Sequence, residues 1–383
     1  MQNQERQVLE LLCRLIAIDT SNPPGNEAAL ARLIAHEMTV MGLETSLRML
    51  DGGRANVVGR IRGSGKKPSL VLLGHLDTVP PGESAWCTGP FQPVIRGGRV
   101  YGRGASDMKS GLAAMIVASG ILAQRRHKLA GDLIFCATAD EEAGGSGAKA
   151  LLADGWLKEA GYLVLGEPTN LHIGIAEKGA LWLEIVTTGK TAHGATPERG
   201  INAIIYMNHI INALTGWNYG FDSHALLGKP TLSLGTIIGG VKTNVVPDHC
   251  QLTLDVRTLP GQDHAVLLSD LNKLLHQLEL QIPDLSVDVR VINERPPIEV
   301  NPDSPLVRAA SEVGSRVSGK LPNLVGTSYY TDAAILTPVT GIPAVSIGPG
   351  DPGQAHQPDE SVSVETLLKA IDFYVQLVKR LLE

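Results

Sequence analysis

A histidine and an aspartate two residues apart stand at the end of an apolar stretch of this sequence, where they could form part of a metal site. Leu70–Leu73 reads as a buried strand, and Gly74, His75, Leu76 and Asp77 follow it. In an extended chain residues i and i+2 share a face, so Asp77 can lie beside His75 and fix which imidazole nitrogen is free. A buried histidine with a satisfied hydrogen bond is the alternative, and this pair alone does not decide between the two.

Five further residues with ligand chemistry occupy comparable places, and each has an ordinary alternative. Asp107 precedes a predicted helix, where it could be only an N-cap. Glu141 and Glu142 belong to three consecutive acids after an apolar strand; these could be a solvated charge run, but a divalent cation would relieve their repulsion. Glu167 ends another apolar strand, and His356 lies in a loop rich in glycine and proline.

Two histidines, one shared aspartate and two glutamates can together hold two adjacent divalent ions. The mixture of nitrogen and oxygen ligands suits zinc better than magnesium. Asp107 can supply the bridge between the two ions. A remaining carboxylate, Glu141 or Glu142, could then take the proton from a bridging water.

Composition excludes several classes of protein. The chain has 383 residues, 43% hydrophobic and 19% charged, which is ordinary for a globular protein of about two domains. A formal net charge of -6 offers no electrostatic footprint for nucleic acid. The sequence contains no run of about 18 apolar residues, so we expect no membrane span. Its four cysteines form no C-x-x-C pair. We therefore expect a cytoplasmic protein with reduced thiols, and neither nucleic acid nor membrane as a partner.

The order of predicted elements indicates an α/β fold with an insertion. Helices are expected at about residues 4–16, 27–41 and 110–123, and strands at 56–62, 69–73, 132–137 and 162–165. This alternation is typical of a helix-covered, mostly parallel sheet. From about residue 177 the pattern changes to strand 180–188, helix 200–214, strands 230–236 and 251–258, helix 265–278 and strand 287–292, a ferredoxin-like α+β domain. A helix at 304–317, a strand at 344–347 and a helix at 364–382 then complete the first domain.

Five motifs, in this order along the chain, resemble one family of enzymes. They are GHLDTVP at residues 74–80, GRGASDMK at 102–109, DEE at 140–142, GEPT at 166–169 and AHQPDE at 355–360. They look like the co-catalytic dizinc amidohydrolases and metallopeptidases, the family of acetylornithine deacetylase, succinyl-diaminopimelate desuccinylase, aminoacylase and glutamate-type carboxypeptidases. The resemblance implies a zinc-peptidase-like catalytic domain at residues 1–176 and 293–383, with a lid or dimerisation domain inserted at 177–292.

The resemblance also implies a role for each matching residue. His75, Asp107 and Glu167 would hold one zinc ion, and Asp107, Glu142 and His356 the other, with cobalt able to substitute. Glu141 would be the general base, and Asp77 would orient His75 from outside the ligand set. In the inserted domain, His193 resembles a histidine that, in dimeric members, stabilises the oxyanion in the partner subunit's site. The substrate-contacting positions would be Asn244, Arg257 and Asp332.

The sequence therefore predicts a zinc-dependent hydrolase that cleaves the amide bond of an N-acyl amino acid or short peptide and forms a homodimer through the inserted domain. The segment from Gly348 to Glu360 looks most like acetylornithine deacetylase, whereas residues 329–333 and Leu76 resemble the desuccinylase and carboxypeptidase members. The acyl group and the amino acid therefore stay open. A carboxypeptidase or dipeptidase is the alternative within enzymes, and a catalytically inactive metal-dependent binding protein is the alternative outside them.

Overall fold

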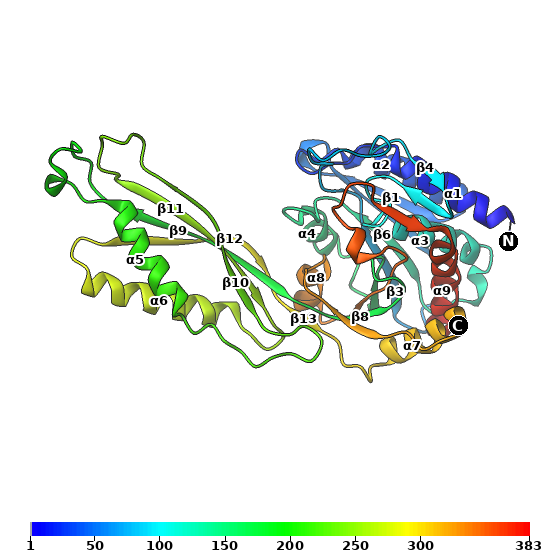
Figure 1. Ribbon diagram of the computed structural model, residues 1–383. Coiled ribbons are helices and arrows are strands. Elements are labelled where there is room, and N and C mark those ends of the chain that lie inside the picture. Colours follow the sequence, from blue (N-terminus) through cyan, green and yellow to red (C-terminus); the bar gives the residue numbers. More distant parts are fainter. Residues whose placement is uncertain (1) are drawn as a thin grey trace. The chain divides into compact units, whose positions relative to one another are not determined.

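The computed structural model describes residues 2–383, apart from the side chains of Gln2 and His127. The chain divides into two compact units, and Figure 1 follows it through both of them. Unit 1 contains the chain up to Ile175 together with Val300–Val325 and Thr331–Glu383. Unit 2 contains Ala176–Glu299 and Gly326–Tyr330. Unit 2 thus interrupts unit 1 along the chain.

The larger sheet has nine strands in the order β1-β2-β6-β3-β7-β15-β8-β13, with β14 paired to β8. Its central pairs, β6 with β3, β3 with β7 and β7 with β15, are parallel, and the flanking pairs β1–β2, β2–β6, β15–β8 and β8–β13 are antiparallel. The bounds are β1 Glu44–Met49, β2 Ala55–Ile61, β3 Ser69–His75, β6 Leu133–Thr138, β7 Ala160–Leu165, β8 Ile173–Glu177, β13 Ile298–Glu299, β14 Leu324–Thr327 and β15 Ala344–Ser346. Every residue of β3 and β6 is buried, as expected for strands covered on both faces.

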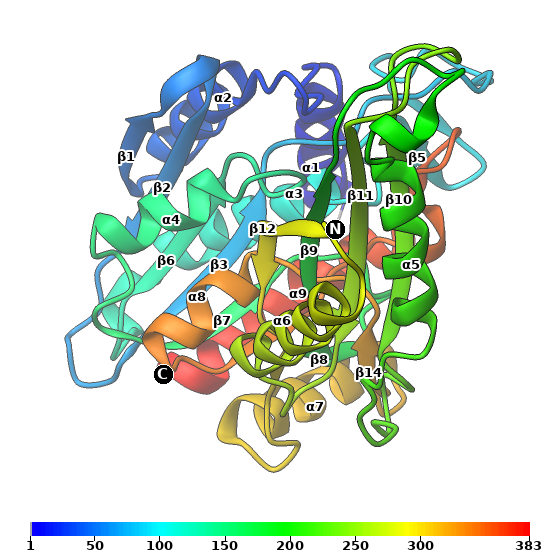
Figure 2. The same cartoon turned by 90° about the vertical axis from the view of Figure 1, so that its left-hand side faces the viewer.

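Helices cover both faces of the parallel strands. Figure 2 shows α4 and α8 on one face and α3 and α9 on the other. Apolar residues of α1, α2, α3, α7 and α9 share one core with the sheet. The bounds are α1 Gln2–Ile16, α2 Glu27–Val40, α3 Lys109–Ala123, α4 Ser146–Ala153, α7 Pro305–Ser318, α8 Ala333–Thr340 and α9 Val364–Leu382. Asp107 lies two residues before the start of α3, so the position of this helix on the sheet fixes where that aspartate lies.

Short elements that the sequence pattern does not predict complete the chain outside the insertion. Strands β4 Val94–Arg96, β5 Arg99–Tyr101 and β16 Ser361–Ser363 form a second, three-stranded sheet in the order β16-β5-β4. The 3-10 helices of unit 1 are Asp51–Gly53, Arg126–Lys128 and Pro352–Gln354, and Pro197–Arg199 is a 3-10 helix of unit 2. Pairing of β16 with β5 attaches the segment that follows His356 to the segment that precedes Asp107.

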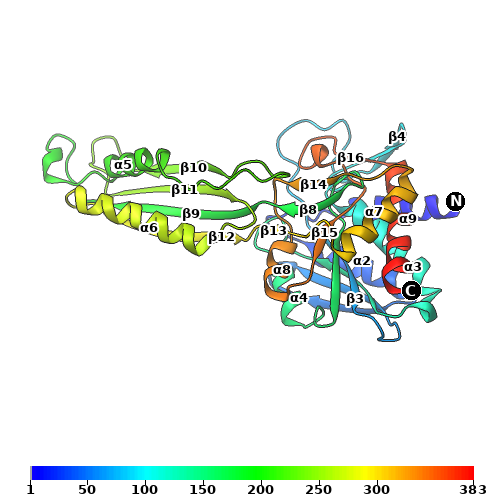
Figure 3. The ribbon, with the colours of Figure 1, turned by 90° about the horizontal axis from the view of Figure 1, so that it is seen from below.

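Unit 2 is built on a four-stranded antiparallel sheet in the order β10-β11-β9-β12. Its elements are β9 Gly179–Thr188, α5 Ala203–Thr215, β10 Thr231–Gly239, β11 His249–Thr258, α6 His264–Gln281 and β12 Ser286–Arg295. Apolar residues of α5 and α6 share one core with the sheet. Figure 3 shows the ribbon of this sheet and its helices from below. This order of strands and helices is the ferredoxin-like arrangement.

The predicted fold class, a helix-covered and mostly parallel sheet with a ferredoxin-like insertion, is confirmed. Strand β12 runs to Arg295 and stays paired with β9 as far as Ala180, within the stretch of unit 2 that ends at Glu299. Within residues 2–383, every helix falls short of the length or the apolar character that spanning a bilayer requires.

Candidate metal centre and active site

His75 is the last residue of β3, and its side chain is 2% exposed. Its Nδ1 lies 2.9 Å from the backbone carbonyl oxygen of Asp77, which can only accept a hydrogen bond. The imidazole Nδ1 therefore carries a proton, which leaves Nε2 as the nitrogen that could bind a metal ion. That Nε2 lies 3.0 Å from Oδ1 of Asp107, within hydrogen-bonding distance of the predicted bridging carboxylate.

Asp107 faces both predicted histidines. Its Oδ1 lies 3.0 Å from His75 Nε2, and its Oδ2 lies 3.5 Å from His356 Nε2. His356 Nε2 also lies 3.3 Å from Oε1 of Glu142. His75, Asp107 and Glu142 can each present one ligand atom within 4.8 Å of the others. One carboxylate thus stands between two imidazoles that are far apart in the sequence.

Glu167 follows β7 at the same carboxyl edge of the sheet and is 4% exposed. Its charge is among those that raise the pKa of His75, and it also raises the pKa of Glu141. All five predicted metal ligands therefore converge on one region of unit 1, although they come from strand ends and loops spread along the chain.

The electrostatics of this region reflect crowded, buried charges. Burial by itself would lower the pKa of His75, but the hydrogen bond with Asp107 and the nearby carboxylates raise it well above its ordinary value. Burial raises the pKa of Glu141 well above its usual range, and the charges of Glu167 and Glu142 add to this. Hydrogen bonds with Asp107 and Glu142 raise the pKa of His356 to about 10. Divalent cations bound among these groups would relieve the repulsion between their carboxylates.

The carboxylate of Asp77 holds the neighbouring glutamates rather than the histidine ring. Its Oδ1 accepts the backbone N–H of Glu141 at 3.1 Å, and its Oδ2 accepts that of Glu142 at 3.0 Å. The same carboxylate is 3.7 Å from His75 Nδ1, farther than the 2.9 Å from that nitrogen to the backbone carbonyl of Asp77. Asp77 therefore orients His75 mainly through its backbone, and its side chain fixes the loop that carries the predicted base.

Three residues that sequence reasoning missed support the same loop. The side-chain amide of Asn22 donates to Asp77 Oδ2 at 2.9 Å and to Asp140 Oδ1 at 3.0 Å. Arg54 forms an ion pair with Asp140 and donates to Asn22 Oδ1 at 3.0 Å. Asp140 has a φ of 69°, a left-handed conformation that these bonds stabilise. Nothing in the sequence pointed to the contacts of Asn22 with Asp77 and Asp140.

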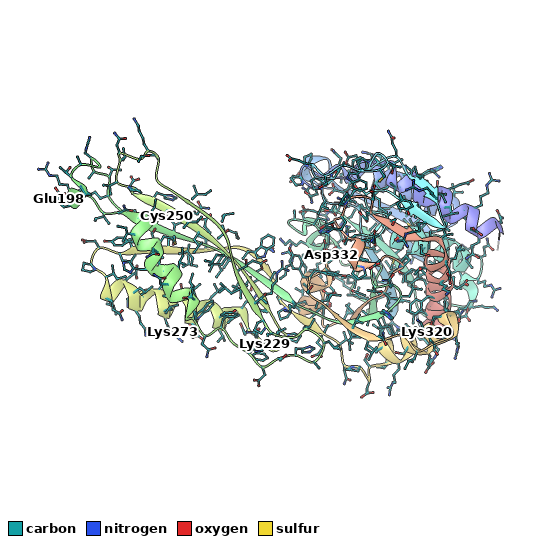
Figure 4. All side chains as sticks on the ribbon, in the orientation of Figure 1. Glu198, Lys229, Cys250, Lys273, Lys320 and Asp332 are labelled. Atoms are coloured by element: carbon teal, nitrogen blue, oxygen red, sulfur yellow. The ribbon has the colours of Figure 1, made fainter. Side chains whose placement is uncertain are left out.

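Asp332 lies at the start of α8 in unit 1, where Figure 4 labels it. It is 3% exposed, and its Oδ2 accepts the hydroxyl of Thr138 at 2.6 Å. Its charge contributes to the raised pKa of Glu141. The side chain predicted to contact substrate is thus buried next to the end of β6.

The other predicted residues, His193, Asn244 and Arg257, belong to unit 2. The segments of His193 and Asn244 are paired, because Gly194 N donates to Asn244 O at 2.9 Å and His193 bridges to Val245. Both side chains are exposed. Arg257, on β11, pairs with Asp255 at 2.9 Å and lies over the ring of Tyr330. Two of these three residues are therefore neighbours, and the third has its guanidinium already bound to an acid.

The donor set fits divalent metal ions. A mixture of nitrogen and oxygen ligands surrounds a shared carboxylate: Nε2 of His75, the two oxygens of Asp107, which face different histidines, and the adjacent Glu142. A buried group of carboxylates is strongly unfavourable unless cations neutralise it. Together with the parallel sheet, this site defines an α/β protein with a candidate two-metal centre.

Comparison with known proteins identifies the family to which this chain belongs. Residues 71–380 match peptidase family M20/M25/M40, and the chain belongs to this family. It is 34% identical over 373 residues to an acetylornithine deacetylase of Edwardsiella ictaluri, which covers 94% of this chain and 92% of the relative. It is 29% identical over 402 residues to a probable succinyl-diaminopimelate desuccinylase of Staphylococcus aureus, covering 97% and 96%. An M20 family metallo-carboxypeptidase from Sulfolobus solfataricus has the same fold, with a TM-score of 0.81 at 21% identity, covering 97% and 98%.

Proposed function

We propose that this protein hydrolyses the amide bond of an N-acyl amino acid at a two-metal centre. The observation that carries the proposal is the position of Asp107, whose two carboxylate oxygens face His75 and His356 separately. The relatives named acetylornithine deacetylase and probable succinyl-diaminopimelate desuccinylase support the substrate class. The carboxypeptidase or dipeptidase alternative finds support in the fold of the metallo-carboxypeptidase.

Zinc is the metal that this donor set favours, with cobalt able to replace it. His75, Asp107 and Glu167 would hold one ion, and Asp107, Glu142 and His356 the other. When bound, the ions would polarise the amide carbonyl and lower the pKa of the attacking water. The residues of the chain itself have the task of holding these ligands in place and of moving protons.

Glu141 is placed to move the proton. It is 9% exposed and immediately precedes the predicted ligand Glu142. Burial raises the pKa of its carboxyl, which brings a carboxylate closer to the basicity that a general base needs near neutral pH. Its carboxylate would accept a proton from the attacking water and deliver it to the leaving nitrogen, so one residue serves both steps.

Residues of unit 2 would recognise the substrate and join two copies of the chain. Arg257 presents a guanidinium suited to a substrate carboxylate, and His193 would stabilise the oxyanion, acting from a second copy in a homodimer. Strand β10 is an edge of its sheet and exposes Leu234, Ile237 and Ile238. An apolar sheet edge of this kind is a suitable surface for pairing with another copy. The cytoplasmic location stays a prediction from sequence.

A panel of substrates tests the proposal. The zinc-loaded protein would be assayed with acetyl-, succinyl- and formyl-amino acids and with dipeptides, and its metal content measured before and after dialysis. We expect about two metal ions per chain and hydrolysis of at least one N-acyl amino acid. Faster cleavage of dipeptides would favour the peptidase alternative. Metal binding with no hydrolysis across the panel would favour a binding protein without catalysis.

A further inference from the structure

Glu360 is a buried carboxylate that takes part in no step of the mechanism above. It is 0% exposed and lies four positions after His356. Its Oε1 accepts the backbone N–H groups of Ser106 at 2.7 Å and Asp107 at 2.8 Å. Its Oε2 accepts the N–H of Gly104 at 2.9 Å and a guanidinium N–H of Arg103 at 2.8 Å. One side chain from the His356 loop therefore organises the whole loop that carries Asp107.

Arg103 extends this connection to a third loop. It is 1% exposed, and besides Glu360 it donates to the carbonyl oxygens of Gln357 and Pro80, both at 3.3 Å. Its guanidinium also lies over the ring of Trp86, 5.0 Å from the ring centroid. Pro80 follows the segment that begins with His75, and Gln357 is adjacent to His356. The ion pair thus touches each of the three segments that hold His75, Asp107 and His356.

A contribution to the stability of the fold does not by itself explain why Arg103 and Glu360 form a buried ion pair. Removing two charges from water is costly, and well-packed apolar residues often serve stability as well or better. Burial indeed raises the pKa of Glu360, although four donors surround it. An apolar replacement, however, could not accept the N–H groups of Gly104, Ser106 and Asp107. The specific capacity of Glu360 is to fix the backbone on which the shared ligand stands.

The loop of His356 is held at Asp351 by the hydroxyl of Ser106 at 2.8 Å and at Asp359 by the N–H of Cys87 at 2.8 Å, and His356 lies between these two points. Between Gly348 and Glu360 its only regular element is the 3-10 helix Pro352–Gln354, and His356 itself has a φ of 64°. The His356 side chain is 50% exposed, whereas His75 is held at the end of a buried strand. Loss of the Glu360 anchor should therefore disturb the His356 half of the centre more than the His75 half.

We propose that the Arg103–Glu360 ion pair is a positioning device that sets the separation of Asp107 and His356 and so allows the centre to hold its second metal ion. This inference rests on the proposed two-metal centre. Outer residues that orient metal ligands typically contribute 10- to 100-fold in metal affinity or activity. The effect of losing the pair should lie in that range and should fall on the second ion.

The test is a calorimetric titration of the metal-free protein with zinc chloride. It is carried out on the unaltered protein and on three full-length variants. Glu360→Gln keeps the size of the side chain but loses the charge and half of the acceptors. Arg103→Lys keeps the charge but loses the fork that reaches three loops. Glu365→Gln is the matched control, because Glu365 is exposed and pairs only locally with Lys369 at 2.7 Å. Thermal unfolding and the separate values of kcat and KM would be measured on each.

We expect two zinc ions in the unaltered protein and in Glu365→Gln. In Glu360→Gln the second ion should bind at least 10-fold more weakly, with kcat reduced and KM little changed, and Arg103→Lys should be intermediate. Two ions bound with unaltered affinity in Glu360→Gln, even with a lower melting temperature, would overturn the inference and leave the pair as a stabilising contact. If Glu360→Gln fails to fold, Arg103→Lys decides by the same criterion. A lack of zinc binding in the unaltered protein would instead refute the proposed function.

Discussion

Asp77 Oδ1 accepts the backbone N–H of Glu141 at 3.1 Å, so the aspartate that follows the first predicted ligand also supports the predicted base. Asp77 is 0% exposed, and its second oxygen accepts the N–H of Glu142 and the amide of Asn22. Three donors thus meet one carboxylate. A substitution that removes an acceptor oxygen from Asp77 should therefore disturb the backbone of Glu141 or Glu142.

For Asp77→Asn we expect a fall in kcat and a loss of stability of about 1–3 kcal/mol, because the new amide group would face a backbone N–H and leave it without an acceptor. Steady-state kinetics and chemical denaturation measure the two effects. Asp51→Asn, an exposed aspartate in a 3-10 helix, is the control. Unchanged kcat in Asp77→Asn would show that the loop of Glu141 does not depend on this carboxylate.

Replacing Glu141 by Gln should lower kcat by about 10²- to 10⁴-fold, the contribution usual for a positioned general base. Metal content should stay the same, since the proposed ligands are untouched. Glu159→Gln, at an exposed position, should behave like the unaltered protein. Kinetics together with metal analysis check this, and full activity in Glu141→Gln with metal bound would remove Glu141 from the mechanism.

Removal of metal by a chelator should lower the melting temperature, because the carboxylates of Asp107, Glu142 and Glu167 would then lie close together without cations. Added zinc should restore it in proportion to the logarithm of the free metal concentration. Asp107→Asn should bind metal weakly and show little response to the chelator. A melting temperature indifferent to both chelator and zinc would argue against a metal centre.

Gly111 in α3 has no room for a side chain. A Cβ there would lie 2.2 Å from the carbonyl oxygen of Gly166, next to Glu167. Gly111→Ala should therefore destabilise the protein by about 1–3 kcal/mol and weaken metal binding, since α3 would have to move away from β7. Gly120→Ala in the same helix is the control, because its Cβ would meet the flexible side chain of Met41. Denaturation curves that coincide for the two variants would contradict this account.

His264 should make the stability of unit 2 depend on pH. Its Nε2 lies 2.9 Å from Thr258 Oγ1 and its Nδ1 3.2 Å from Glu294 Oε1. Burial lowers its pKa, although the charges of Glu294 and Asp263 oppose this. The unfolded chain therefore takes up the proton first as pH falls below about 6.5, and the free energy of unfolding should fall by at most about 1.4 kcal/mol per pH unit.

Urea denaturation at several pH values between 5 and 8 measures this dependence. In His264→Gln the contribution of this residue to the change of unfolding free energy with pH should disappear. In His276→Gln, at an exposed position, the pH dependence should stay as in the unaltered protein. An identical pH dependence in His264→Gln and the unaltered protein would assign the effect to other groups.

Two of the proposed ligands could be predicted from an abrupt change in local pattern. His75 and Glu167 interrupt apolar strands whose carboxyl ends must meet at one edge of a parallel sheet. Asp107 and His356 have no such local signal, and their motifs gained meaning only from the order of all five. Strand β1 and the small sheet of β4, β5 and β16 were missed, because short or exposed strands have little apolar periodicity.

The residues that support the ligands could not be predicted from patterns. Asn22 reaches Asp77 and Asp140, and Glu360 reaches the backbone of Asp107, through contacts between loops far apart in the chain. Such contacts depend on where turns place a single side chain, and no periodicity in the sequence reports this. The role of Asp77 illustrates the same limit, since its position beside His75 was evident but its hydrogen bonds to the Glu141 loop were not.

The contact between Arg103 and Glu360 joins residues 257 positions apart, and that between His356 and Glu142 joins residues 214 positions apart. Contacts over such separations form late, because the entropy of closing a long loop is lost before they contribute. A chain released from synthesis before residue 356 would lack the last ligand and the anchor of Asp107. High-affinity metal uptake should thus mark the end of folding and distinguish complete molecules from partly folded ones.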